Sequence, residues 1–159
     1  MRVDELMCRE VGWVTLNDHA NEAARILWEC DCGIGPVVRS SETRQLAGVL
    51  TDRDICMAAY TQGKPLAEIS VESAMAHDVL TCAPGDPIAV VEERMRNAQV
   101  RRLPVVDSSG SLVGMISLAD IAREAGRPHA AQRRDGVDAR AVGATLASIT
   151  QPHAAVAAS

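Results

Sequence analysis

Apolar residues follow a helical spacing in two stretches of the chain and form short runs in several others. In the first helical stretch, Asp18–Cys30, one face carries the apolar residues Ala20, Ala23, Ala24, Leu27 and Trp28. The second stretch, Asp86–Ala98, is its counterpart in the other half of the chain. Asp18 and Asp86 are the predicted N-caps, and Pro87 then takes the first helical position.

The short apolar runs are bounded by turn residues and predict strands. In the first half of the chain these strands are Val11–Thr15, Pro36–Arg39 and Leu46–Leu50. In the second half they are Val79–Cys82, Leu103–Val106 and Leu112–Ile116. A short helical turn precedes each set and ends at Met7 or Met75. A further helix closes each set, starting at Thr51 or Ser117 and running to about Tyr60 or Glu124.

The two halves of the chain are an internal repeat. "VDELM" from Val3 aligns with "VESAM" from Val71, and "GPVV" aligns with "LPVV" at the same offset of 68 residues. Across the next loop the offset falls to 66, so that "GVLTDRDI" from Gly48 aligns with "GMISLADI" from Gly114. One copy has too little core to stand alone. We therefore predict an α+β fold in which two β-α-β-β-α repeats pack with pseudo-two-fold symmetry.

The repeat also sets the predicted organisation of the chain. Residues 1–62 and 71–126 are the two repeats, residues 63–70 are a linker, and residues 127–159 are an Ala-rich tail. The tail carries apolar residues at helical spacing, Val137, Val142, Leu146 and Ile149. It either forms a short helix, which docks on its own or a partner module, or is disordered.

Composition and charge argue against several classes of protein. The chain of 159 residues is 47% apolar, which is enough for a core. Its net charge of −5 argues against general nucleic-acid binding, which needs a basic footprint. No apolar stretch approaches the roughly 18 residues of a membrane helix, and no signal segment begins the sequence. The spacing of its five cysteines is not that of a disulfide framework. We therefore expect the protein to be located in the reducing cytoplasm.

No group of residues forms a catalytic or metal-binding pattern. Cys30 and Cys32 form a C-x-C pair without two further ligands nearby, and we interpret them as small apolar residues at a helix end. The sequence has no nucleophile–base pair and no phosphate-binding glycine loop. Glu92 and Glu93 are expected on the solvated face of a helix. We predict no enzyme activity, no metal and no obligatory cofactor.

The repeated "TDRD" (Thr51–Asp54) and "SLAD" (Ser117–Asp120) allow two interpretations. A hydroxyl residue followed three positions later by an acid stabilises a helix start on its own. The same residues also suit a nucleotide. A helix N-terminus attracts a phosphate, to which the hydroxyl can donate, and the carboxylate can accept hydrogen bonds from the vicinal diol of a ribose. The pseudo-symmetry would bring two such helix starts together.

With both repeats in view, the chain resembles a tandem pair of CBS domains, the Bateman module. The resemblance covers about residues 3–125 and depends on the order of "VDELM" and "VESAM", "GIGPVV" and "QVRRLPVVD", and "GVLTDRDI" and "GMISLADI". It implies a regulatory module that binds an adenosine-containing ligand between the repeats. AMP, ADP or ATP is the expected ligand, and S-adenosylmethionine or NAD(H) is the alternative. It also implies a homodimer and an unidentified regulated protein.

In such pairs, each pocket combines the Thr/Ser-x-x-Asp of one repeat with strands of the other. Carried over to this sequence, pocket one consists of Thr51, Arg53, Asp54, Val79, Thr81, Val100, Arg101, Arg102 and Pro104. Pocket two consists of Ser117, Asp120, Trp13, Gly33, Ile34 and Pro36.

The two pockets differ in charge. Pocket one has three arginines near the expected phosphate, and their counterparts in pocket two are uncharged: Ala119, Gly33 and Ile34. We therefore expect pocket one to prefer phosphorylated ligands. Trp13 departs from the small polar residue usual in the family. It either stacks on an adenine or fills the cavity, and we favour filling or an uncharged ligand there. A rival hypothesis is a structural dimerisation module with occluded pockets.

Overall fold

The computed structural model describes residues 1–127 and 136–151, and they form two compact units. The first-repeat unit consists of Cys8–Ala83 and Pro104–Met115. The second-repeat unit consists of Met1–Met7, Pro84–Leu103 and the chain from Ile116 onward. The N-terminal residues therefore pack with the second repeat, although they precede the first in the sequence.

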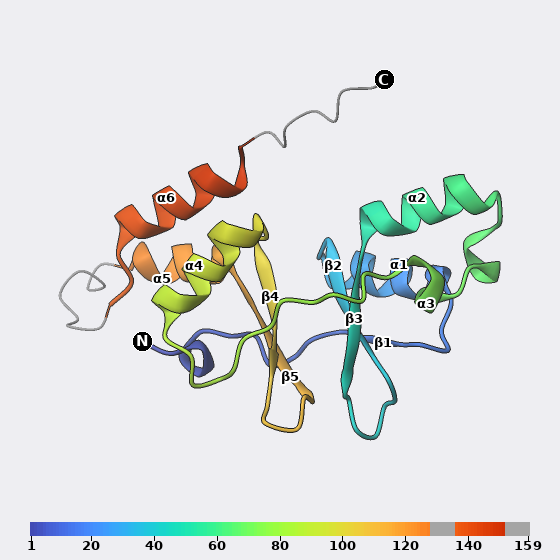
Figure 1. The fold of residues 1–159 in the computed structure, drawn as a ribbon, viewed down its shortest axis with the longest axis horizontal. Coiled ribbons are helices and arrows are strands. Elements are labelled where there is room, and N and C mark those ends of the chain that lie inside the picture. Colours follow the sequence, from blue (N-terminus) through green and yellow to red (C-terminus); the bar gives the residue numbers. More distant parts are fainter. Residues whose placement is uncertain (128–135, 152–159) are drawn as a thin grey trace. The chain divides into compact units, whose positions relative to one another are not determined.

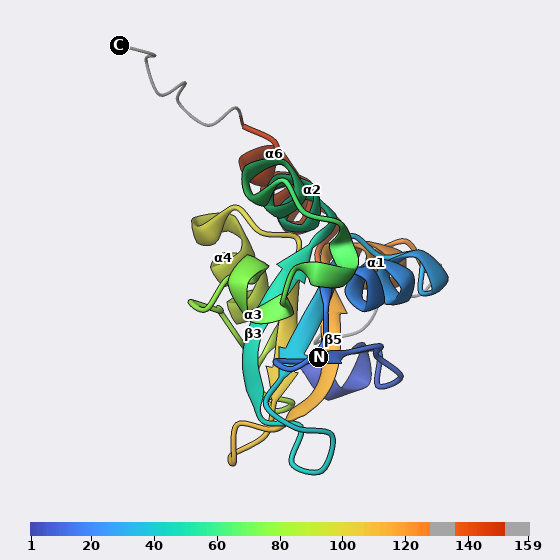
Figure 2. The same cartoon turned by 90° about the vertical axis from the view of Figure 1, so that its right-hand side faces the viewer.

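The first-repeat unit is built on a three-stranded sheet in the order β1-β2-β3. Its strands are β1 (Val14–Thr15), β2 (Ile34–Val38) and β3 (Leu46–Thr51). β1 and β2 are parallel, β2 and β3 are antiparallel, and Ile34 pairs with Thr51. The helices of this unit are α1 (Ala20–Glu29), α2 (Asp52–Gln62), the 3-10 turn η2 (Leu66–Glu68) and α3 (Val71–Ala74). β3 runs directly into α2 (Figures 1 and 2), which fixes where α2 begins.

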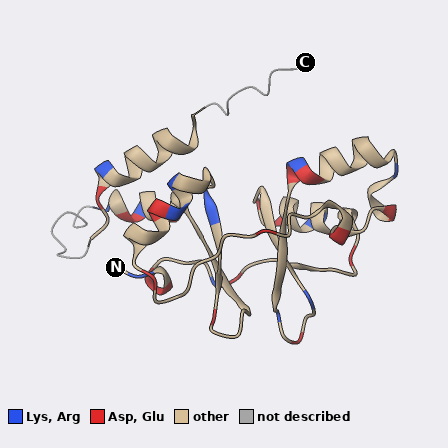
Figure 3. Cartoon of the chain, in the orientation of Figure 1, with Lys and Arg blue, Asp and Glu red and all other residues tan. Residues whose placement is uncertain are grey.

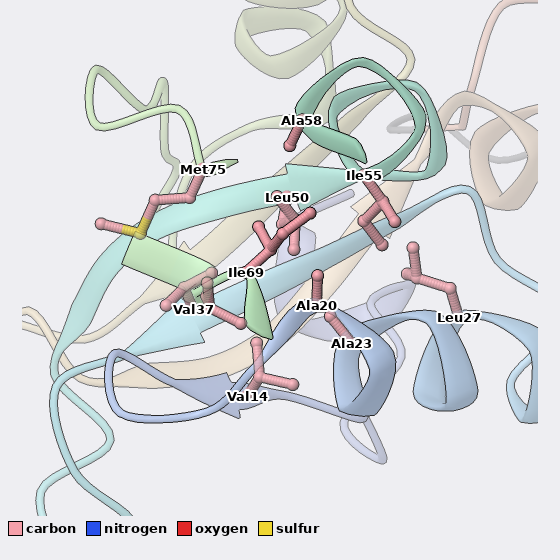
Figure 4. Packing of buried hydrophobic residues seen from close by; sticks show 11 residues of the cluster. Val14, Ala20, Ala23, Leu27, Val37, Leu50, Ile55, Ala58, Ile69 and Met75 are labelled. Carbon is pink, nitrogen blue, oxygen red and sulfur yellow. The ribbon is translucent and has the colours of Figure 1, made fainter. Parts of the chain in front are cut away.

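The core of this unit lies between the sheet and its helices. Figure 4 shows its side chains gathered between the strands and helices α1 and α2; they are Val14, Ala20, Ala23, Leu27, Val37, Leu50, Ile55, Ala58, Ile69, Val71 and Met75. The glycine of "GVLTDRDI" has a packing reason. A Cβ at Gly48 would lie 2.6 Å from the carbonyl oxygen of Ala76 and 2.8 Å from Sδ of Met75. Only glycine lets β3 and the segment around Ala76 approach this closely.

The second-repeat unit contains the 3-10 turn η1 (Val3–Glu5), α4 (Ile88–Ala98), α5 (Leu118–Ala125), α6 (Ala139–Ile149) and the ends of β4 (Arg102–Val106) and β5 (Leu112–Ser117), which pair with each other. The second repeat has the same helix–strand–strand–helix order, α4-β4-β5-α5, and its unit adds segments from both ends of the described chain. The chain's start is tied to the segment before α4, because the Val3 amide donates to the Asp86 carbonyl at 3.0 Å. The predicted strand Val79–Cys82 is reduced to a single parallel bridge between Cys82 and Val105.

The two predicted aspartate N-caps are each wrong by one residue. α1 begins at Ala20 with His19 as its N-cap, and the Asp18 carboxylate instead accepts from the Thr15 amide at 2.7 Å. α4 begins at Ile88 with Pro87 as its N-cap, so the proline precedes the first helical position. Asp86 forms an ion pair with Arg94 at 2.6 Å. In both places the acid has a partner outside the helix start.

The tail contains the helix α6, which packs against α4 and α5 (Figure 1). Thr145 is fully buried in this packing and accepts a hydrogen bond from the Arg96 guanidinium at 3.3 Å. The side-chain amide of Gln99 donates to the Ser148 carbonyl at 3.2 Å. Leu146, predicted on the docking face, is 48% exposed. Figure 3 shows that α6 carries almost no charge beyond its first turn. Residues 128–135 and 152–159 of the predicted tail lie outside the described residues.

Candidate ligand-binding site

The first candidate site is the start of α2. Thr51 is the N-cap, and its Oγ1 accepts from the Asp54 amide at 3.1 Å. In return, Asp54 Oδ2 accepts from the Thr51 amide at 2.9 Å and from the Thr51 hydroxyl at 2.6 Å. The pair is a complete capping box, as expected if "TDRD" serves to stabilise the helix start. These two bonds occupy Oδ2. Oδ1 has no hydrogen-bond partner among the described residues, so both of its lone pairs are available to a ligand.

The start of α5 repeats this geometry in the second repeat. Ser117 is the N-cap, and its Oγ accepts from the Asp120 amide at 3.2 Å. Asp120 Oδ2 accepts from the Ser117 amide at 2.8 Å and from the Ser117 hydroxyl at 2.6 Å. The sequence prediction that both motifs lie at helix starts is therefore correct in detail. Thr51, Asp54, Ser117 and Asp120 are all partly buried.

The two boxes differ at the second carboxylate oxygen. Asp120 Oδ1 accepts from the guanidinium of Arg123, three residues further along α5. The equivalent position in α2 is Met57, which has no donor. Sequence reasoning missed Arg123, although an arginine three positions after an aspartate on a helix is a recognisable ion-pair spacing. Asp54 Oδ1 therefore has no partner among the described residues, whereas Asp120 Oδ1 already accepts one hydrogen bond.

Each box also has neighbours from the preceding strand of its own repeat. Ile34 pairs with Thr51, and the Asp52 amide approaches the Gly33 carbonyl at 3.4 Å. In the second repeat, the Leu118 amide donates to the Arg101 carbonyl at 2.9 Å. The structure thus places Gly33 and Ile34 beside Thr51, and Arg101 beside Ser117. The predicted grouping of Arg101 and Arg102 with Thr51, and of Gly33 and Ile34 with Ser117, joins residues of the two units and stays a prediction.

A hollow of about 390 Å³ lies over the box of the second repeat. It is lined by Arg101, Arg102, Ser117, Leu118, Ala119, Ala122, Val142 and Leu146. Two of these residues belong to α6, which makes the tail part of the wall of a candidate site. The sequence had singled out Val142 and Leu146 only as a helix face.

Trp13 lies in a much smaller space. Together with Pro36, Gly35 and Leu50 it borders a crevice of about 10 Å³. Whether Trp13 stacks on an adenine or fills the cavity stays a prediction.

The remaining predicted site residues lie on several different segments of the chain. Val79 and Thr81 are half-buried and fall between two anchored positions, the bridge of Ala76 to Val49 and that of Cys82 to Val105. Pro104 is buried and accepts from the Cys82 amide at 3.1 Å. Val100 is half-buried after the end of α4, and Arg53 is exposed in the first turn of α2.

Two further features bear on the chemistry of the site. Within residues 1–127 and 136–151, no three His, Cys, Asp or Glu side chains are grouped to hold a metal ion. No helix in this part of the chain is long and apolar enough to cross a membrane.

Glu92 corrects a sequence prediction. It was expected on a solvated helix face, yet it is only 4% exposed where α6 covers α4, and its Oε1 has no partner in the described structure. Burial raises the pKa of Glu92; the positive charge of Arg96 opposes this shift, and the negative charge of Asp138 adds to it.

Comparison with known proteins gives one consistent family. The model of the family described as "CBS domain" matches residues 3–60 and 69–127. The CBS domain-containing protein YhcV of Bacillus subtilis (strain 168) is 33% identical over 120 residues, which cover 76% of this chain and 82% of that protein. L-aspartate semialdehyde sulfurtransferase of Methanosarcina acetivorans is 32% identical over 124 residues, which cover 76% of this chain and only 23% of the relative.

A solved structure gives the same result. The CBS domain pair of protein MJ0100, in complex with 5′-methylthioadenosine and S-adenosyl-L-methionine, is 27% identical to this chain. The TM-score is 0.67, and the match covers 77% of this chain and 98% of the other.

Proposed function

Since the chain belongs to the CBS domain family, we propose that it is a non-catalytic regulatory module that binds an adenosine-containing ligand and signals to a partner protein. AMP, ADP or ATP is the proposed ligand. The observation that carries the proposal is the open Oδ1 of Asp54 in a box whose other contacts are complete. A structural cap needs only Oδ2, whereas a ribose diol needs a free carboxylate oxygen.

The proposed contacts follow from the geometry of this box. Asp54 Oδ1 accepts from the ribose hydroxyls. The N-terminus of α2 would favour a phosphate through the helix dipole, because the Thr51 hydroxyl and the first backbone amides of the helix already donate within the box. The family resemblance adds Val79, Thr81, Val100 and Pro104 to this pocket, and it places the positive charges of Arg53, Arg101 and Arg102 near the phosphate. In pocket two, the ion pair of Asp120 and the packing of Trp13 support weaker binding.

Two alternatives remain in the same family. The MJ0100 structure contains S-adenosyl-L-methionine and 5′-methylthioadenosine, which makes a sensor of an adenosyl compound without phosphate the second candidate; NAD(H) is a further one. The rival from another class is a structural dimerisation module with occluded pockets.

Calorimetric titration of the purified protein with AMP, ATP, S-adenosylmethionine and NADH separates these functions. We expect AMP or ATP to bind more tightly than the other two ligands. Tighter binding of S-adenosylmethionine would replace the proposed ligand, and the absence of heat with all four would support the structural module. Adenosine, which lacks the phosphate, serves as the matched control.

We further propose a homodimer acting on a regulated protein in the cytoplasm, without nucleic-acid or membrane partners. The net charge of −5 supports the absence of nucleic acid.

A further inference from the structure

The hollow of about 390 Å³ beside α6 is distinct from the nucleotide pockets considered above. Its lining includes Ser117 but not Asp120, the acid that a ribose diol would need. All of its lining residues belong to the second-repeat unit, whereas each predicted nucleotide pocket joins residues of both units. One wall is α6, which lies beyond the residues that the CBS family model matches. The ligand of this hollow must therefore be inferred from its own lining.

Most of the lining is apolar. The apolar residues come from two helices and are Leu118, Ala119 and Ala122 of α5 and Val142 and Leu146 of α6. A hollow of this volume falls within the range of small-molecule sites, which are lined mainly by apolar side chains with a few polar groups. Hydrogen bonds from Arg96 and Gln99 of α4 hold α6 in place. An apolar chain can therefore lie between two walls that belong to separate helices.

Two adjacent arginines supply the charge of the hollow. Arg101 and Arg102 line it, no Asp or Glu does, and neither guanidinium forms an ion pair or hydrogen bond within the described part of the chain. The Ser117 hydroxyl, which is the other polar side chain of the lining, already donates to Asp120 and accepts from its amide. The two guanidiniums therefore remain for a polar ligand. They select an anion, because arginine forms paired, charge-assisted hydrogen bonds with carboxylate and phosphate.

We propose that this hollow binds a small amphiphilic anion, with a carboxylate or phosphate head at Arg101 and Arg102 and an apolar chain between α5 and α6. A nucleotide would find no open acceptor for its ribose in this lining. An inorganic anion would leave the apolar walls in contact with water, and an uncharged apolar molecule would leave the arginines without a counter-charge. Because Arg101 and Arg102 are also predicted to attract the phosphate of AMP, the two ligands should compete if both proposals hold.

Calorimetric titration of the full-length chain with octanoate tests the site. Butanoate has the same head and a shorter chain, and each buried methylene strengthens binding by about fourfold, so butanoate should bind at least about 30-fold more weakly. 1-Octanol has the same chain without the charge and should bind at least about 10-fold more weakly, because it forms no charge-assisted bonds with arginine. Octyl phosphate then identifies the preferred head, and tighter binding of either octyl anion supports the proposal.

Two sets of variants locate the ligand. Val142→Glu places a negative charge in the α6 wall and should weaken octanoate binding by at least about 10-fold. Ala144→Glu is the matched control, because it adds the same charge at an exposed position of α6 outside the lining, and it should leave the affinity unchanged. Replacing Arg101 and Arg102 together with Gln should bring the affinities for octanoate and 1-octanol to within about twofold of each other. Neither arginine side chain has an internal partner, so this double variant should fold even if Val142→Glu displaces α6.

Three results would overturn the inference: no binding of either octyl anion at millimolar concentration, equal affinities of the wild-type chain for octanoate and 1-octanol, or an octanoate affinity that the double Gln variant leaves unchanged. Calorimetry with AMP on the same samples keeps the two proposals apart. If octanoate binds as expected and AMP does not, the proposed nucleotide is wrong and the hollow stands as a site. If AMP binds to a chain that does not bind either octyl anion, the site is wrong and the proposed function stands.

Discussion

The aspartates of the two capping boxes, Asp54 and Asp120, have the same role in the fold and different capacity for a ligand. In each box one carboxylate oxygen accepts from the N-cap residue at between 2.6 and 2.9 Å. The other oxygen is open in Asp54 and is paired with Arg123 in Asp120. The helix starts are therefore matched structurally, and the difference lies one turn along the helix, where Met57 stands in place of Arg123. A duplicated motif can keep its structural function in both copies while only one copy keeps a free acceptor.

The helix pairs of the two repeats also differ, in whether another helix covers them. α4 and α5 are covered by α6, while α1 and α2 leave an apolar hollow. The sequence offers a physical reason, since Arg96 and Gln99 hold α6 by donating hydrogen bonds that the aligned residues Trp28 and Asp31 together cannot supply. The two repeats thus share a fold and have separate surfaces for contact with other molecules.

The largest expected effect is that of Asp54→Ala. Each hydrogen bond to a charged carboxylate contributes on the order of 1.5–3 kcal/mol. Losing two from a ribose should weaken binding of AMP by at least roughly 100-fold. Losing the capping box should also lower the free energy of unfolding, by about 0.5–2 kcal/mol. Calorimetry and thermal melting measure the two quantities on the same sample.

Asp120→Ala is the matched control for this comparison, because it removes the same box from the other repeat. We expect it to lower stability by a similar amount and to leave the main binding event intact. If Asp120→Ala rather than Asp54→Ala removes the nucleotide, the proposed ranking of the two pockets is wrong.

The next effect concerns the arginines. Replacing Arg101 and Arg102 together with Ala should weaken AMP and ATP by roughly 10-fold or more and change adenosine little, because arginine forms paired, charge-assisted bonds with phosphate. The salt dependence of AMP binding should also become flatter. Equal losses for AMP and adenosine would show that the two side chains shape the pocket and do not contact the phosphate.

Much of this arrangement was predictable from the sequence, because it depends on local patterns. The N-caps Thr51 and Ser117 and the CBS domain pair are confirmed, and so is the order of strands and helices except for the predicted strand Val79–Cys82, which is a single bridge. The N-caps Asp18 and Asp86 were wrong, because an acid near a helix start can bind a neighbouring turn or a distant arginine.

What could not be predicted depends on contacts between distant segments. Glu92 looks like a surface residue of an amphipathic helix, and only the packing of α6, some fifty residues later, buries it. Thr145, not an apolar residue, is the most buried position of α6, because its hydroxyl bonds to the Ala141 carbonyl and to Arg96. An apolar-face pattern cannot identify such a position.

A smaller effect on AMP binding is expected from giving the first capping box the arginine of the second. Met57→Arg places a guanidinium three residues after Asp54, as Arg123 stands after Asp120. The new ion pair should compete with the ribose for Oδ1 and weaken AMP binding several-fold. Met57 is partly exposed, so the longer side chain fits without repacking. Met57→Gln, which is similar in length and uncharged, is the control; a loss of affinity equal to that of Met57→Arg would mean that the size of the side chain is responsible.

The smallest effect is on stability alone and concerns the covered helix pair. Burial raises the pKa of Glu92 in the folded chain above its unfolded value, so the folded state holds the proton to higher pH. The free energy of unfolding therefore falls as pH rises from the unfolded pKa of about 4.3 through the raised folded value. Glu92→Gln removes the charge and should raise the free energy of unfolding at pH 7 by about 1 kcal/mol. Below pH 4 the two proteins should be equally stable.

Glu93 provides the control, because it is the exposed neighbour of Glu92 on α4. Glu93→Gln should leave the free energy of unfolding at pH 7 almost unchanged, and its pH dependence should follow that of the wild type. Urea unfolding at several pH values measures both variants. If Glu92→Gln and Glu93→Gln change the free energy of unfolding equally, the packing of α6 on α4 does not exclude water from the Glu92 carboxylate in solution. In that case the contrast between the open and the covered helix pair would be weaker than the structure indicates.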